Sequence, residues 1–93
     1  MTVQEKIHEY LSVHRDEMVE DIKTLIKVDS ARAEALPGKP YGEGAAEALH
    51  AGLSLFEKHG FLGKNWDNYA IDTVINGKEL GLDILAHLDV VPG

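Results

Sequence analysis

The sequence predicts an α/β fold, in which two helical segments precede a β-hairpin. Apolar residues recur with the 3.6-residue period of a helix over residues 3–26 and again over 45–59. Residues 66–88 instead contain two β-type runs, separated by an Asn-Gly pair. Helices followed by paired strands indicate a layered α/β architecture.

The composition limits the size of the protein and the classes to which it can belong. With 93 residues it forms one small domain at most, which buries roughly 60–65% of the surface that its unfolded chain exposes. A content of 44% hydrophobic and 27% charged residues is typical of a globular chain rather than a disordered one. The net charge is −7 and there is no basic run, so neither nucleic acid nor a membrane is an expected partner.

The chain has no cysteine, no signal peptide and no apolar stretch approaching ~18 residues. The absence of cysteine excludes disulfide scaffolds, thiolate zinc sites and cysteine nucleophiles, so a metal site has to use histidines and carboxylates. We therefore expect a cytoplasmic protein.

The first helical segment has one apolar stripe and one charged face. A break near residues 12–15 leaves two interpretations open, one long helix or two short ones. A loop is predicted over residues 29–44, where prolines and glycines cluster. The stripe consists of Val3, Ile7, Leu11, Met18, Ile22, Leu25 and Ile26.

The second helical segment is predicted from Ala45 to His59, with Gly60 in the left-handed conformation that often follows a helix. Small residues along it would allow another element to approach closely.

A hairpin is expected to follow, with a strand over residues 66–75, a tight turn at Asn76-Gly77 and a return strand from Glu79 to Leu88. The return strand is almost continuously apolar, as in strands covered on both faces. Such a strand needs neighbours on both edges, whereas the hairpin supplies one. We therefore interpret residues 1–93 as the N-terminal portion of a larger α/β domain.

Four of the five histidines have structural explanations. The Glu5–His8 and Glu47–His50 pairs have the spacing found in di-metal helical bundles, but they lie away from the apolar stripes and should face solvent. His14 falls on the apolar stripe if the first helix is continuous, which favours a packed, hydrogen-bonded side chain. His59 ends the second helix, where a cation interacts favourably with the helix dipole.

His87 differs, because it stands with Asp89 at the end of an apolar strand. Residues two apart on a strand point to the same side. Open α/β sheets form their ligand crevices at this end of their strands. Two interpretations follow: a hydrogen-bonded pair that completes the strand, or a metal ligand and the carboxylate that orients it. The spacing alone is a weak motif.

The wider sequence resembles a known enzyme family over about residues 5–93. The motif HLDVVPG after a hairpin resembles the first metal-ligand motif of the zinc-dependent aminopeptidase/aminoacylase family of co-catalytic metallopeptidases. The stretches PYGEGAAEALHAGLSLFEKHGF and KNWDNYA are similar to its bacterial dipeptidase V and Xaa-His dipeptidase branch. The resemblance implies the N-terminal part of a mixed-sheet catalytic domain, without the rest of that domain and without the lid domain.

The resemblance also implies roles for the two residues. His87 would bind one of two zinc ions, and Asp89 would serve catalysis by holding the imidazole in its orientation. The implied reaction is hydrolysis of dipeptides by a zinc-activated water. The remaining ligands and the glutamate base would follow Gly93, so we expect residues 1–93 alone to be inactive.

Two alternatives remain open. The same family includes amidohydrolases that remove acyl groups from amino acids, and a chain of this length is also compatible with a non-catalytic interaction module. The expected partner is a small peptide substrate. Because the return strand would leave apolar surface unpaired, we also expect this segment to self-associate.

Overall fold

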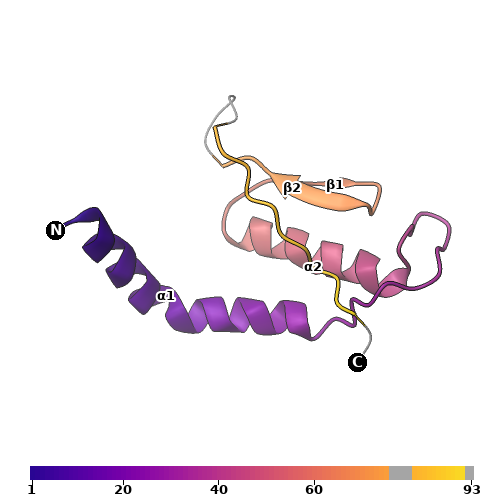
Figure 1. Cartoon of the computed structure of the whole chain (residues 1–93), viewed down its shortest axis with the longest axis horizontal. Helices are drawn as coiled ribbons and strands as arrows, with labels where there is room; N and C mark the ends of the chain where they lie inside the picture. The colour runs from indigo at the N-terminus through magenta and orange to yellow at the C-terminus, as the bar shows by residue number, and fades with distance from the viewer. Residues whose placement is uncertain (76–80, 92–93) are drawn as a thin grey trace.

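The computed structural model describes residues 1–75 and 81–91. It contains helices α1 (Val3–Ile26) and α2 (Glu43–Lys58) and strands β1 (Gly63–Trp66) and β2 (Ala70–Thr73). The two strands pair in antiparallel fashion. Helix α2 contacts both strands and also α1, and Figure 1 shows it between the hairpin and α1. The predicted order of two helices and a hairpin is confirmed.

Helix α1 is one continuous helix of 24 residues, which decides between the two interpretations left open by the sequence. Thr2 caps it by accepting a hydrogen bond from the Glu5 amide. The helix axis bends between its two halves (Figure 1), and Ser12 Oγ donates to the His8 carbonyl at 2.9 Å in this part of the helix. Such back-bonding bends helices, so the sequence irregularity produces a bend and not a break.

Helix α2 supplies most of the small core. Its buried residues are Ala45, Ala46, Ala48 and Gly52. A Cβ atom added at Gly52 would lie 2.8 Å from the Ile71 side chain, so the hairpin packs directly against the helix there. This contact confirms that the small residues allow a close approach.

The hairpin turn lies nine residues earlier than predicted, at Asp67-Asn68, and the expected unbroken strand over residues 66–75 is wrong. The φ values of Asp67 and Asn68 are 54° and 62°, as a type I′ turn requires. The Asn65 side chain accepts a hydrogen bond from the Asn68 amide at 2.7 Å and so stabilises the turn. The predicted turn at Asn76-Gly77 lies outside the described residues.

The predicted return strand is also wrong over its described part, residues 81–88, which form no strand. The segment is held near its end by an isolated parallel bridge between Ala31 and Val90. Leu85 is 93% exposed, so the segment is not covered on both faces. A β-strand forms only when it is hydrogen-bonded to a neighbouring strand, and no described strand pairs with residues 81–88.

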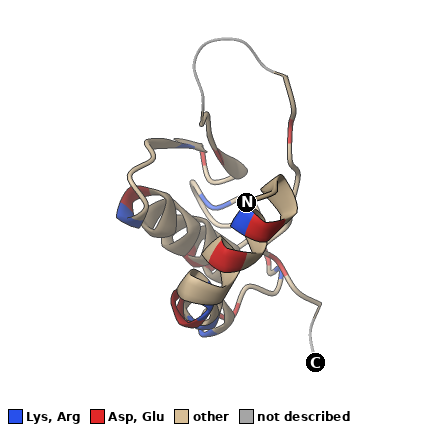
Figure 2. Ribbon diagram, turned by 90° about the vertical axis from the view of Figure 1, so that its left-hand side faces the viewer, with Lys and Arg blue, Asp and Glu red and all other residues tan. Residues whose placement is uncertain are grey.

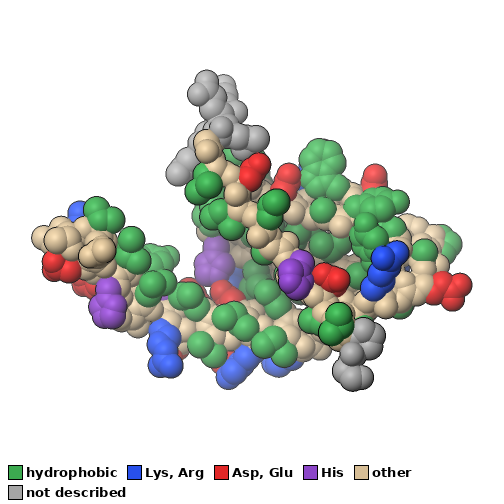
Figure 3. Space-filling model, in the orientation of Figure 1, with side chains coloured by type: hydrophobic (Ala, Val, Ile, Leu, Met, Phe, Trp, Pro, Cys, Tyr) green, Lys and Arg blue, Asp and Glu red, His purple; other side chains and the backbone are tan. Residues whose placement is uncertain are grey.

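The described residues form no basic patch on the surface. Lys and Arg are dispersed among Asp and Glu (Figure 2). Within the same residues, neither helix has a stretch long and apolar enough to cross a membrane. Figure 3 shows many hydrophobic side chains on the surface, and α1 has no buried residue at all.

Candidate functional site

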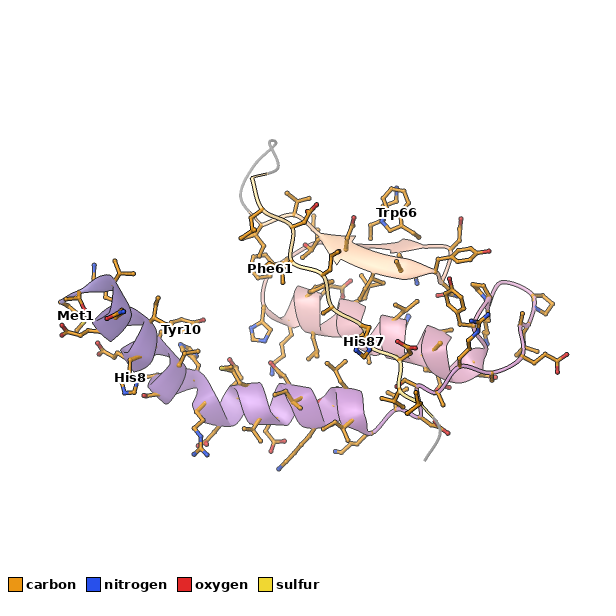
Figure 4. All side chains as sticks on the ribbon, in the orientation of Figure 1. Met1, His8, Tyr10, Phe61, Trp66 and His87 are labelled. Carbon is orange, nitrogen blue, oxygen red and sulfur yellow. The ribbon has the colours of Figure 1, made fainter. Side chains whose placement is uncertain are left out.

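The candidate site lies on the segment that follows the hairpin. Residues 82–91 run across α2, and His87 projects from them in front of that helix (Figure 4). The Val90 amide donates to the Ser30 carbonyl at 3.4 Å, and Leu88 approaches Gly52 of α2. These two contacts fix the position of His87 and Asp89 relative to the helices.

The predicted His87–Asp89 pair is present, with both side chains on the same side of the segment. His87 Nδ1 lies 3.4 Å from Asp89 Oδ1 and 3.0 Å from the Asp89 backbone oxygen. Both oxygens can only accept, so a hydrogen bond at this position places a proton on Nδ1, and the neutral form of the ring then has its lone pair on Nε2. This is the tautomer that a metal-binding imidazole needs, and the backbone oxygen of Asp89 orients the ring together with its carboxylate.

The setting of the pair differs from the predicted buried strand end. The side chains of His87 and Asp89 are 85% and 62% exposed. No crevice surrounds them, because the strands that would form its walls are not among the described residues.

The described residues do not fit a zinc ion by themselves. No three His, Asp or Glu side chains among them are close enough together to hold a metal. A catalytic zinc site needs about three protein ligands and an open position, whereas the pair offers one imidazole and its neighbouring carboxylate. Further ligands would have to come from elsewhere.

Two of the other histidines face solvent, as predicted. His8 and Glu5 are exposed on α1, and His50 and Glu47 are exposed on α2. The second pair borders a shallow hollow of about 390 Å³. The other residues that line this hollow are Lys39, Glu43, Ala46, Ala51 and Asn68.

The prediction of a packed, hydrogen-bonded His14 is wrong. Its side chain is 40% exposed, with its ring 4.1 Å from that of Tyr10 and its Nδ1 3.8 Å from a Glu17 oxygen. The reason is that no described element packs on this part of α1.

A polar cluster that the sequence did not predict joins the two helices. Asp21 of α1 accepts from Lys58 Nζ at 2.6 Å and lies 2.7 Å from His59 Nε2, with its own side chain only 17% exposed. The hydrogen bond from Lys58, followed by that from His59, holds the pKa of Asp21 below its ordinary value. The same contact with Asp21 raises the pKa of Lys58.

One signal could have found this cluster. Asp21 is an acidic residue at the edge of the apolar stripe of α1, next to Ile22 and one turn before Leu25. Burying a carboxylate at such a position costs free energy unless a cationic partner contacts it. The identity of that partner, however, is set by the packing of two helices and not by local spacing.

Comparisons with known proteins show that the chain is similar to part of two proteins that carry the name "putative dipeptidase". No protein family model and no solved structure matches it. It is 35% identical over 80 residues to a Bacillus subtilis (strain 168) protein named "Putative dipeptidase YtjP", in a match that covers 84% of this chain and 17% of that protein. It is also 35% identical over 91 residues to a Staphylococcus epidermidis (strain ATCC 12228 / FDA PCI 1200) protein named "Putative dipeptidase", in a match that covers 96% of this chain and 19% of that protein. The chain thus spans less than a fifth of the curated relatives that it matches.

Proposed function

We propose that this chain forms one part of a zinc-dependent dipeptidase and supplies a metal ligand to it. The observation that carries the proposal is the similarity to two proteins that carry the name "putative dipeptidase", which extends over 84% and 96% of the chain. The longer match, which covers 96% of the chain, includes the segment that contains His87 and Asp89. Short peptides are therefore the proposed substrates.

The geometry of the pair supports the role given to each residue. With its proton on Nδ1, a neutral His87 has Nε2 available for a metal, while the backbone oxygen of Asp89 accepts from Nδ1 and its carboxylate lies 3.4 Å away, so that both orient the ring. Zinc held in a complete site would lower the pKa of a bound water and polarise the peptide carbonyl. The remaining ligands and the base lie outside the 93 residues in this proposal, in agreement with the 17–19% of the relatives that the chain spans. We therefore expect the 93-residue chain alone to be inactive.

The proposal is tested on the product of the complete reading frame that contains these residues. His87→Ala is compared with His8→Ala, which replaces an exposed histidine far from the site. We expect His87→Ala to lower the bound metal, measured by mass spectrometry, and to abolish hydrolysis of a dipeptide panel. Asp89→Asn should reduce metal affinity or activity by about 10–100-fold. Unchanged metal content and rate in His87→Ala would refute the proposal.

The same assays separate the alternatives. Hydrolysis of N-acyl amino acids without hydrolysis of dipeptides would identify a deacylase. A product that holds no metal and cleaves neither class would indicate a non-catalytic interaction module. Zinc-dependent dipeptide hydrolysis by the purified 93-residue chain would contradict the expectation that this part is inactive.

A further inference from the structure

Both polar groups of the peptide unit between Asp89 and Val90 have partners. Its oxygen, which can only accept, lies 3.0 Å from His87 Nδ1, and its N–H donates to the Ser30 carbonyl at 3.4 Å. The oxygen and the N–H of a trans peptide point in opposite directions within one plane. This plane therefore connects the His87 ring on one side with Ser30 on the other.

The His87 ring depends on this peptide for its orientation. Its side chain is 85% exposed, so packing does not hold it. An exposed side chain samples several rotamers unless hydrogen bonds restrict it. The ring nitrogen Nδ1 instead contacts the backbone oxygen and the carboxylate of Asp89. The orientation of the ring therefore follows the position of the 89–90 peptide.

Ser30 belongs to a short segment, residues 29–31, whose own position is fixed. Ser30 is buried, with 3% of its surface exposed. Ala31 forms the parallel bridge with Val90, and its amide donates to Asp29 Oδ1 at 3.4 Å. Figure 1 shows this first part of the loop between α1 and α2 beside the end of the chain. The segment thus offers Val90 one defined register.

Gly44, in the first turn of α2, determines how closely the 29–31 segment approaches the helix. A Cβ atom added at Gly44 would collide with the backbone oxygen of Asp29. A Cβ atom added at Gly42 would lie 2.8 Å from the Cβ atom of Ala33, so the chain is close to the helix at a second point. Only a residue without a side chain permits such an approach without displacement. The two glycines therefore set the position of the segment.

We propose that residues 29–31, seated on Gly44, are a positioning element for the His87 imidazole, which they reach through the 89–90 peptide. Gly44 sets the position of the segment, and the Ser30 carbonyl in it sets the position of the peptide. The importance of this element for a metal ligand rests on the proposed function, whereas the orientation of the ring does not. Gly44 is thus a positioning residue that acts on a histidine in a distant part of the sequence.

Nuclear magnetic resonance of the 93-residue chain tests the positioning without a metal. At about pH 9, well above the ordinary histidine pKa of about 6.5, the ring nitrogen shifts report which nitrogen carries the proton. We expect the proton of His87 on Nδ1 in the parent chain and a mixture of both tautomers in Gly44→Ala. The Val90 amide, which loses the Ser30 carbonyl, should exchange roughly five- to tenfold faster in this variant. The signals of His87 are identified by their absence from His87→Ala.

Gly63→Ala is the matched control, because its added Cβ atom also meets α2. This atom would lie 2.5 Å from the Leu53 side chain and 2.9 Å from that of Phe56, where the helix faces the hairpin. We expect Gly63→Ala to lower the stability but to keep the His87 tautomer and the Val90 exchange of the parent chain. Far-UV circular dichroism verifies that both variants retain the helices.

A second pair of variants keeps the test decisive if Gly44→Ala does not fold. Asp29→Ala removes the acceptor of the Ala31 amide, whereas Asp29→Asn keeps an oxygen there. We expect Asp29→Ala to change the His87 tautomer in the same direction as Gly44→Ala. Asp29→Asn should keep the tautomer of the parent chain.

The product of the complete reading frame separates this inference from the proposed function. There Gly44→Ala should weaken metal binding about tenfold, as replacements of groups that orient a ligand do, and Gly63→Ala should not. A parent product without bound metal refutes the proposed function, while a changed His87 tautomer in Gly44→Ala would still support the positioning. Folded Gly44→Ala and Asp29→Ala variants with the tautomer and Val90 exchange of the parent chain would overturn it. Equal changes in Gly63→Ala would also overturn it, because they would show a general loosening of the fold.

Discussion

Asp21 and His59, separated by 38 positions in the sequence, meet at 2.7 Å between Asp21 Oδ2 and His59 Nε2. The other carboxylate oxygen of Asp21 receives Lys58 Nζ at 2.6 Å. One side chain of α1 thus binds both residues at the C-terminal end of α2. Since α1 has no buried residue, this cluster is a main tertiary attachment of the helix.

Replacing Asp21 with Asn should therefore loosen α1 from α2. The variant keeps the size of the side chain but removes the charge that both Lys58 and His59 contact. We expect thermal unfolding monitored by circular dichroism to shift down by a few degrees, with faster amide exchange in residues 17–26. Asp16→Asn, which changes an exposed carboxylate on the same helix, is the control and should leave both measurements unchanged.

The same cluster should make stability depend on pH in two windows. The pKa of Asp21 is lowered from 3.8, so its contribution is complete above pH 3.8 and is lost as the pH falls through the native pKa. The pKa of Lys58 is raised from 10.5, so its contribution is complete below pH 10.5 and is lost as the pH rises through the native pKa. Urea unfolding at a series of pH values measures the free energy of unfolding in both pH windows.

In Asp21→Asn, the losses of stability that this cluster causes at low pH and at high pH should both disappear. The titrating carboxyl group is gone, and Lys58 loses the partner that raises its pKa. An Asp21→Asn variant whose stability profile coincides with that of the parent chain at both extremes of pH would contradict this assignment.

Gly44→Ala should destabilise the fold although alanine favours a helix. A Cβ atom at Gly44 would collide with the backbone oxygen of Asp29, which cannot move as a side chain can. We expect a net loss of about 1–3 kcal/mol, typical of overpacking. Without that contact, the substitution within α2 would stabilise the protein by about 0.5–1 kcal/mol, so the sign of the change is decisive. Gly81→Ala, with no atom within 4 Å of the added Cβ, is the control.

Asp67→Val should disrupt the hairpin, since Asp67 has a φ of 54° that β-branched residues avoid. We expect a destabilisation of about 1–2 kcal/mol in urea unfolding. Asp67→Gly should be neutral or stabilising, because glycine adopts this conformation without strain. Equal stability of the Val and Gly variants would show that the turn does not have its type I′ geometry.

The local signals in the sequence were sufficient for both helices and for the exposed Glu-His pairs. Helical periodicity predicted residues 3–26 as helical, and Gly60, with a φ of 85°, follows α2 as expected. Local geometry was also sufficient to place His87 and Asp89 on one side of their segment, because that depends on the period of an extended chain and not on distant contacts.

The position of the turn could not be decided locally. Asp67-Asn68 and Asn76-Gly77 both contain residues that tolerate a positive φ. The hydrogen bond from the Asn68 amide to the Asn65 side chain is a local contact that favours the earlier turn. The packing of Ile71 against Gly52 favours it as well, and this contact joins residues that only folding brings together.

By itself, then, the sequence determined which segments are helical, where the small residues of the core lie, and which imidazole stands beside a carboxylate. Only the tertiary structure decided that residues 81–88 form no strand, that His14 stays half-exposed, and that Asp21 binds Lys58 and His59. The physical reason is the range of the interactions. Helices close their hydrogen bonds within four residues, whereas strands, burial and ion pairs depend on which distant segments come to lie beside them.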